Sequence, residues 1–159
     1  MIGLAKKKDY RLSDMAPDKP IVLLEDPHDA ENVGAVIRVA AGYGAGAVVV
    51  TGSINPWHAS VVRTAAGLHW ALPVFHVENV EEIMAERKVY ACSDEGENIY
   101  DQTLDPGGVY VFGTERAGIS DVLKKCADQI IALPMSEKVS SLNLATSVSG
   151  VLYASRINF

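Results

Sequence analysis

Six short apolar runs, separated by polar turns, divide this chain into elements. They lie at residues 21–24, 47–50, 72–75, 89–92, 109–112 and 129–133. Runs of this length, bounded by glycine, proline and polar residues, are typical of buried strands rather than helices. The pattern therefore predicts six strands. Residues 93–108 are polar and rich in turn formers, which predicts a surface segment between the fourth and fifth strands.

Helical periodicity occupies most of the gaps between these runs. After Asn32, apolar residues recur at the spacing of one helix face, at Val33, Val36, Ile37 and Ala40, and glycines 42, 44 and 46 end the pattern. Further helices are expected at 56–66, at 79–86 with Val80, Ile83 and Met84 inward, and at 119–126. A last helix begins near Ser141, and its predicted inner face consists of Leu142, Ala145, Val148, Ser149 and Leu152.

The alternation of strands and helices predicts the fold class. Residues 21–50 form a strand–helix–strand unit, whose two strands should be parallel. The whole pattern predicts an α/β fold with a mostly parallel sheet flanked by helices. Such sheets bind ligands at the carboxyl ends of their strands, where Gly113 and Pro134 fall. We expect one domain over residues 21–159, preceded by a loose arm over residues 1–20.

Composition narrows the possible partners and compartment. A chain of 159 residues with 48% hydrophobic residues can bury its own core. Its net charge of −6 disfavours a general polyanion binder, although Lys6-Lys7-Lys8, Arg63 and Lys124-Lys125 leave room for local basic patches. Two cysteines provide no disulfide framework. With no apolar run near the roughly 20 residues of a membrane span and no signal-peptide pattern, the sequence predicts a cytoplasmic protein.

Several common sites are not supported by the sequence. The glycines at 42, 44 and 46 follow a helix rather than a strand, so they do not match a dinucleotide-binding loop. Gly113 and Gly118 have phosphate-loop spacing, but Ile119 replaces the required lysine. The four histidines lack metal-ligand spacing, so we expect no metal site.

Three polar residues are candidates for chemistry. Arg38 lies about 150° from the centre of the apolar stripe on its helix, where a solvated surface arginine is also common. Glu115 follows a strand and precedes a helix, a position that also suits a carboxylate at a helix N-terminus. Asn143 could simply cap the last helix. Taken singly, these residues leave both interpretations open.

Three ordered blocks together resemble the SpoU (TrmH-like) family of the SPOUT superfamily, RNA ribose 2′-O-methyltransferases. Asn32-Val33-Gly34-Ala35-Val36-Ile37-Arg38 is similar to the family's N-x-G-x-x-x-R motif. Residues 112–120 resemble its G-x-E-x-x-G block, and Leu133-Pro134-Met135 followed by Ser141-Leu142-Asn143 resembles its I-P-M…S-L-N signature. The resemblance covers about residues 20–156, and its departures, such as Leu133 for isoleucine, remove no functional group.

The resemblance implies a C-terminal deep trefoil knot that binds S-adenosylmethionine, and a homodimer in which each site is completed by the partner. It also implies a set of cofactor-binding residues, namely Cys92, Ser93, Gly113, Glu115, Leu133, Met135, Ser141 and Leu142. The catalytic set that it implies consists of Arg38, Asn32, Glu115 and Asn143. Asn32 would orient Arg38 or the target ribose, and Asn143 would hold the third block.

Arginine stays protonated near neutral pH, so we hypothesise that Arg38 clamps a phosphate or ribose rather than acting as a base. The predicted activity is methyl transfer to a ribose 2′-hydroxyl of tRNA or rRNA, with the RNA class left open. Two alternatives are a non-catalytic RNA-binding or ribosome-assembly factor with the same fold, and an unknotted nucleotide-binding domain. A methyl-transfer assay separates the first alternative from the enzyme.

Overall fold

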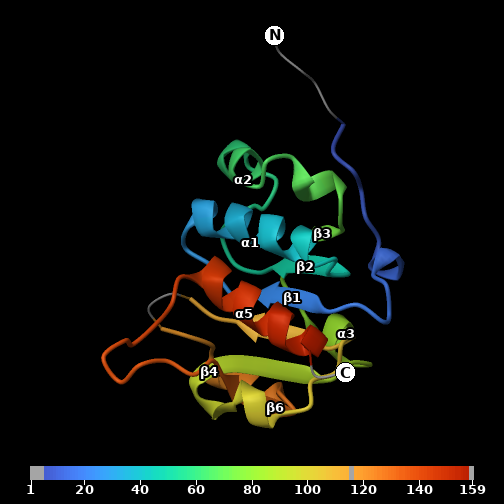
Figure 1. The fold of residues 1–159 in the computed structure, drawn as a ribbon. Coiled ribbons are helices and arrows are strands. Elements are labelled where there is room, and N and C mark those ends of the chain that lie inside the picture. The colour runs from blue at the N-terminus through green and yellow to red at the C-terminus, as the bar shows by residue number, and fades with distance from the viewer. Residues whose placement is uncertain (1–5, 115–116, 158–159) are drawn as a thin grey trace.

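Six parallel strands form one sheet in the order β3-β2-β1-β5-β4-β6 (Figure 1). The structure, a computed structural model, describes residues 6–114 and 117–157. The strands are β1 Ile21–Leu24, β2 Ala47–Val50, β3 Val74–His76, β4 Val89–Asn98, β5 Val109–Phe112 and β6 Gln129–Ala132. The predicted parallel pairing of residues 21–24 with 47–50 is confirmed, in the register Ile21 to Ala47.

Helices cover both faces of this sheet. They are α1 Ala30–Gly42, α2 Ala59–Thr64, α3 Glu81–Met84, α4 Asp121–Cys126 and α5 Leu144–Ile157, with short 3-10 turns η1 Leu12–Asp14, η2 Leu68–Trp70 and η3 Ile99–Asp101. Alternate strand residues point to opposite faces. Val22 and Val48 therefore pack with α1 and α5, whereas Leu23 and Val49 pack in a second cluster that includes Ile83 and Leu123. Burial on both faces explains the continuous apolar runs.

The polar segment after residue 92 departs from its prediction. A surface segment was expected over residues 93–108, but β4 continues to Asn98 beside β6, and Ile99 and Leu104 are buried. Beyond Ala91, β4 has no described pairing with β5, so polar side chains can occupy the strand there. A Cβ on Gly96 would lie 2.5 Å from the carbonyl carbon of Ile131, so the two chains approach too closely for a side chain.

The predicted inner face of the last helix is confirmed at Val148 and Leu152 but wrong at Leu142. Leu142 precedes α5 and is 42% exposed, while Leu144, Val148, Val151 and Leu152 are buried. The helix begins later than expected because Asn143 caps it, its Oδ1 accepting hydrogen bonds from the amides of Ala145 and Thr146. From β6 at one edge of the sheet, the chain returns to place α5 against α1 and β5 (Figure 1).

The described part of the N-terminal arm is attached to the domain. The Trp70 indole donates to the Lys6 carbonyl at 3.0 Å, and the Tyr10 hydroxyl donates to the His69 carbonyl at 3.3 Å. The Arg87 guanidinium donates to carbonyls of both the arm and the domain, at Ala16, Lys19 and Gly107. In residues 6–157 as described, no helix is long and apolar enough to cross a bilayer.

Candidate functional site

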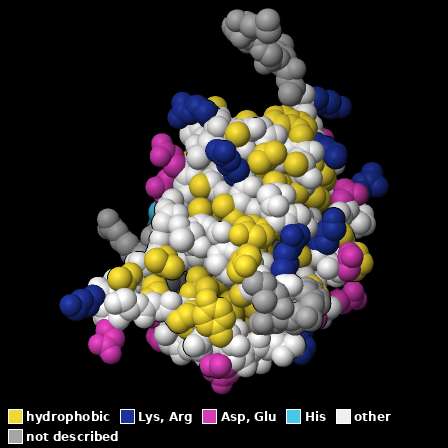
Figure 2. Space-filling view, in the orientation of Figure 1, with side chains coloured by type: hydrophobic (Ala, Val, Ile, Leu, Met, Phe, Trp, Pro, Cys, Tyr) yellow, Lys and Arg dark blue, Asp and Glu magenta, His cyan; other side chains and the backbone are white. Residues whose placement is uncertain are grey.

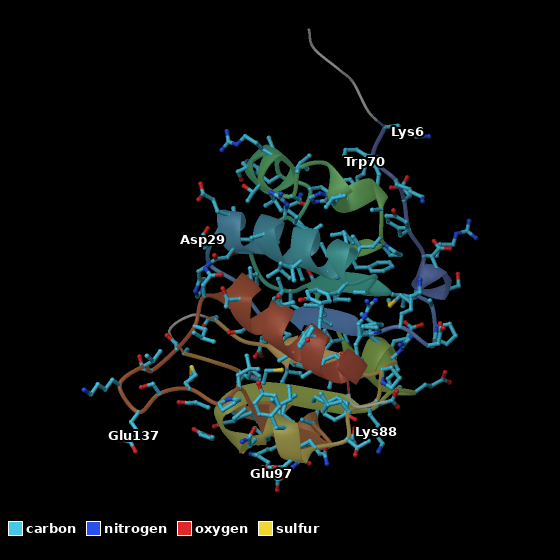
Figure 3. All side chains as sticks on the ribbon, in the orientation of Figure 1. Lys6, Asp29, Trp70, Lys88, Glu97 and Glu137 are labelled. Carbon is cyan, nitrogen blue, oxygen red and sulfur yellow. The ribbon has the colours of Figure 1, made fainter. Side chains whose placement is uncertain are left out.

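A cavity of about 310 Å³ opens at the ends of β5 and β6, beside residues 92–95 in the middle of β4. Seven of the eight predicted cofactor-binding residues line it, namely Cys92, Ser93, Gly113, Leu133, Met135, Ser141 and Leu142. The eighth, Glu115, lies outside the described residues. The loop between β6 and α5, marked by Glu137 in Figure 3, contributes one wall of the cavity. The structure thus brings together residues that are up to 50 positions apart in the sequence.

A tight turn after β5 forms another wall. Thr114 and Gly118 pair in an antiparallel bridge, with reciprocal backbone hydrogen bonds of 3.0 and 3.1 Å. A Cβ at position 113 would lie 2.0 Å from the carbonyl carbon of Gly118, so only glycine lets the turn fold back over the strand end. Gly118 has φ +69°, a conformation that favours glycine. Gly113 and Gly118, whose spacing resembles a phosphate loop without its lysine, therefore shape this cavity.

The cavity lining combines apolar and charged groups. Burial raises the pKa of the Cys92 thiol, which keeps it protonated and uncharged at neutral pH. At the rim, the Lys124 ammonium lies 3.1 Å from a Glu95 carboxylate oxygen. The sequence indicated Lys124 only as part of a local basic patch, and it did not predict that Lys124, Glu95, Asp94 or Ser147 lines the cavity. Ser147 alone had a signal, because it lies one helical turn after Asn143.

The two asparagines predicted to be catalytic meet beside the cavity. The Asn143 amide donates to the Oδ1 of Asn32 at 2.9 Å. Asn143 caps α5 through its own oxygen, so one side chain both starts α5 and ties it to the first turn of α1. Its neighbours Leu142 and Leu144 line the cavity. The first and third sequence blocks are thereby joined.

Arg38 is placed differently. Its side chain is exposed, does not line the cavity, and makes no hydrogen bond or ion pair within the described part of the chain. Six positions separate it from Asn32, which corresponds to about 120° around α1 and about 9 Å along it. Asn32 and Arg38 therefore lie on different sides of the helix, and the structure does not bring them together.

A second, shallower concavity lies on the outer face of α1 and α5. Its lining consists of Val39, Tyr43, Ala145, Thr146, Ser149, Gly150 and Tyr153. The hydroxyls of Tyr43 and Ser149 are 3.1 Å apart, and Tyr153 is 58% exposed. We refer to this surface as the α1–α5 groove. Figure 2 shows hydrophobic side chains reaching the surface over these two helices.

Metal-ligating residues do not cluster in the part of the chain that is described. Within residues 6–114 and 117–157, no group of three or more histidine, cysteine, aspartate or glutamate residues is placed to hold a metal ion.

Comparison with known proteins gives a consistent set of similarities. Residues 19–153 match the model of the SpoU rRNA Methylase family. The chain is 32% identical over 142 residues to an uncharacterized tRNA/rRNA methyltransferase of Archaeoglobus fulgidus, covering 84% of this chain and 62% of that protein. It is 29% identical over 140 residues to the 23S rRNA (guanosine-2′-O-)-methyltransferase RlmB of Pectobacterium atrosepticum, covering 84% and 57% respectively.

Solved structures agree with this result. The SpoU methyltransferase AviRb from Streptomyces viridochromogenes, in complex with AdoMet, aligns with a TM-score of 0.83 and 25% identity. The alignment covers 91% of this chain and 63% of AviRb. The chain thus spans about three fifths of the length of the relatives it matches.

Proposed function

The chain belongs to the SpoU rRNA methylase family, and we propose that it transfers a methyl group from S-adenosylmethionine to a ribose 2′-hydroxyl of RNA. The observation that carries the proposal is the convergence of three distant sequence blocks. Residues of the second and third blocks line one cavity, and the Asn32–Asn143 hydrogen bond joins the first block to its edge. An arrangement that unites all three blocks is what a methyl donor and an acceptor require.

The cavity suits the cofactor. Its volume of about 310 Å³ lies within the range of roughly 300–1,000 Å³ that is typical of small-molecule sites. Leu142 is an apolar side chain left 42% exposed beside it, and a bound purine would cover such a surface. Gly113, Leu133 and Leu142 would contact the cofactor, with Cys92, Ser93, Met135, Ser141 and Glu115 shaping its surroundings. S-adenosylmethionine supplies an electrophilic methyl group on a sulfonium.

The residues of the chain act on the acceptor. During transfer an O–CH₃ bond forms, the S–CH₃ bond breaks, and the 2′-hydroxyl proton leaves to water. A protonated Arg38 binds a phosphate or the ribose and stabilises the developing alkoxide, with no need for a neutral guanidine. Asn143 and Asn32 hold the wall of the cavity in place.

We also propose a homodimer. Arg38 does not line the cavity of its own chain, so a second copy is the simplest means of bringing this cation to a bound cofactor. The α1–α5 groove, with its exposed Tyr153, supports pairing through these helices. We further propose that the return of the chain from β6 to α5 forms a trefoil knot. The proposed location of the protein is the cytoplasm.

Incubation with total cellular RNA and labelled S-adenosylmethionine, followed by mapping of the modified nucleotide, tests the activity. The expected product is a 2′-O-methylated nucleotide in ribosomal or transfer RNA. A methylated base would overturn the reaction assignment. Cofactor binding without transfer to any RNA would favour a non-catalytic RNA-binding or assembly factor instead.

A further inference from the structure

Both tryptophans of the chain, Trp57 and Trp70, belong to a single surface cluster with the N-terminal arm. Their rings meet edge to face, with centroids 5.8 Å apart. The Lys7 ammonium lies 5.4 Å from the centroid of Trp57, and the Trp70 indole is bonded to the carbonyl of Lys6. Figure 3 shows Lys6 and Trp70 side by side at one end of the molecule. We call this cluster the tryptophan surface.

A buried histidine packs beneath these rings. His69 is fully buried beneath them, with its ring 4.9 Å from that of Trp57. Its Nε2 is bonded to the Pro56 carbonyl at 2.7 Å, which fixes the imidazole. Trp70 remains 37% exposed, although its indole N–H already has a partner. An exposed aromatic ring that is held in place by buried neighbours is well suited to stacking on another planar ring.

The charge around the tryptophan surface differs from that of the whole chain. Although the net charge is −6, no aspartate or glutamate occurs from Asn32 to Val77, a segment that includes α1, α2 and η2. The same segment carries Arg38 and Arg63, both exposed, and the adjoining arm adds Lys6, Lys7 and Lys8, while its three acidic residues, Asp9, Asp14 and Asp18, all follow these lysines. None of these five cations forms an ion pair within residues 6–114 and 117–157.

The position of α2 connects the tryptophan surface with Arg38. Gly34 of α1 packs so closely on α2 that a Cβ there would lie 2.6 Å from the Cβ of Thr64. Arg38 follows one turn later, on the solvent side of the same flank of α1. An extended polymer that lies across α2 can therefore contact Arg38, Arg63 and the tryptophan surface in turn.

We infer that the tryptophan surface binds a single-stranded segment of RNA, with bases stacked on Trp70 and Trp57 and phosphates paired with Lys7 and Arg63. Lys7 would leave the Trp57 ring for a phosphate when RNA binds. This inference rests on the proposed function for its choice of RNA, and it adds a second RNA contact outside the cavity. Stacking on aromatic rings requires unpaired bases, so duplex RNA should bind less well.

Intrinsic fluorescence provides a direct measurement, because the chain has two tryptophans and both lie in this surface. Titration with a short single-stranded oligoribonucleotide should quench the fluorescence in a saturable way. Trp70→Ala and Lys7→Ala should each weaken binding by about 10-fold, measured by anisotropy of labelled RNA. Trp70→Phe keeps a ring and should retain most of the affinity. Lys7→Ala should also reduce the salt slope by about 0.7, the value for one single-strand phosphate contact.

Lys88→Ala is the matched control, since this exposed lysine lies at the opposite end of the molecule (Figure 3). It should leave RNA affinity unchanged. Equal loss from Lys88→Ala and Lys7→Ala, absence of quenching, or equal affinity for duplex RNA would each overturn the inference. Methyl transfer with an unchanged KM in Trp70→Ala would also overturn it while leaving the proposed function intact. Quenching by RNA without methyl transfer would support the inference and contradict the proposed function.

Discussion

Asn143 donates a hydrogen bond of 2.9 Å to Asn32, across 111 positions of sequence. The same Asn143 side chain caps α5. Serine also caps helices well but is too short to reach Asn32, so Asn143→Ser separates the two roles. We expect Asn143→Ser to unfold at nearly the wild-type temperature, yet to methylate RNA at least about 10-fold more slowly, because the cavity wall shifts.

Asn143→Ala is the comparison variant, since it removes the cap as well and should cost about 1 kcal/mol of unfolding free energy. Thermal unfolding and single-turnover methyl transfer measure the two effects. Wild-type rates in Asn143→Ser would show that the contact between the asparagines has no role in the reaction.

Gly113→Ala and Gly118→Ala are a matched pair of substitutions that test the turn over the cavity. Gly113→Ala forces a Cβ against backbone atoms of Gly118 and Ile119, at 2.0 and 2.2 Å, so the turn must open. Gly118→Ala meets no atom within 4 Å and only has to adopt a positive φ, at a cost of about 1 kcal/mol. Calorimetric titration with S-adenosylmethionine should therefore show strong loss of affinity only for Gly113→Ala. Equal affinities in the two variants would contradict this account.

Arg38→Lys tests the assignment of the exposed arginine. Lysine keeps the charge but loses the planar fork that binds a phosphate or ribose through two parallel hydrogen bonds. We expect methyl transfer to fall by about 100-fold while the affinity for S-adenosylmethionine is unchanged. Full activity in this variant would eliminate the proposed clamp.

Tyr153→Asp tests the homodimer. Tyr153 is 58% exposed in the α1–α5 groove, and a carboxylate buried at an interface without a partner is costly. Sedimentation velocity should show dimers for the wild type and mostly monomers for the variant. Tyr100→Asp, at a tyrosine that is 74% exposed but lies outside the groove, should remain dimeric. A wild-type monomer that is fully active would refute the requirement for a second chain.

His69 makes stability depend on pH. Its burial lowers the pKa of the imidazole below the ordinary value of 6.5, and the hydrogen bond to Pro56 only partly opposes this. Below pH 6.5 the unfolded chain gains a proton that the folded chain resists, so the free energy of unfolding falls until pH reaches the lowered pKa. Above 6.5, His69 is neutral in both states and contributes no slope.

His69→Gln should be less stable than the wild type at pH 8 but lose less further stability between pH 6.5 and 5. Denaturant melts at these pH values measure the difference. Parallel stability curves for the two proteins would mean that another group causes the acid sensitivity.

Most of the sheet could be predicted from the sequence because its strands are buried on both faces. Residues 21–24 and 109–112 are uninterrupted apolar runs for this reason. The extension of β4 could not be predicted, since residues 93–98 are mostly polar and only Glu97 and Asn98 among them pair, with β6 alone. The inner face of α5 depended on where the helix begins, and the capping role of Asn143 moved that start beyond Leu142.

The candidate site was predictable where short motifs carry it and unpredictable where contacts are long-range. Gly113 and Ser141 were named from their blocks, and the structure places both at the cavity. The Glu95–Lys124 pair joins residues 29 positions apart and belongs to no periodic pattern. The role of Arg38 was named from its motif, but the sequence could not reveal that it lies away from the cavity of its own chain.

The segment from Asn32 to Val77 contains no acidic residue, so negative charge is distributed unevenly along the chain. All 20 acidic residues lie elsewhere in the chain. In the field of a polyanion, a particle with this charge separation rotates before it makes contact, so that its cationic end arrives first. A net negative charge then repels unproductive approaches, and the orientation of the encounter is selected at a distance of about one Debye length, roughly 8 Å at physiological salt.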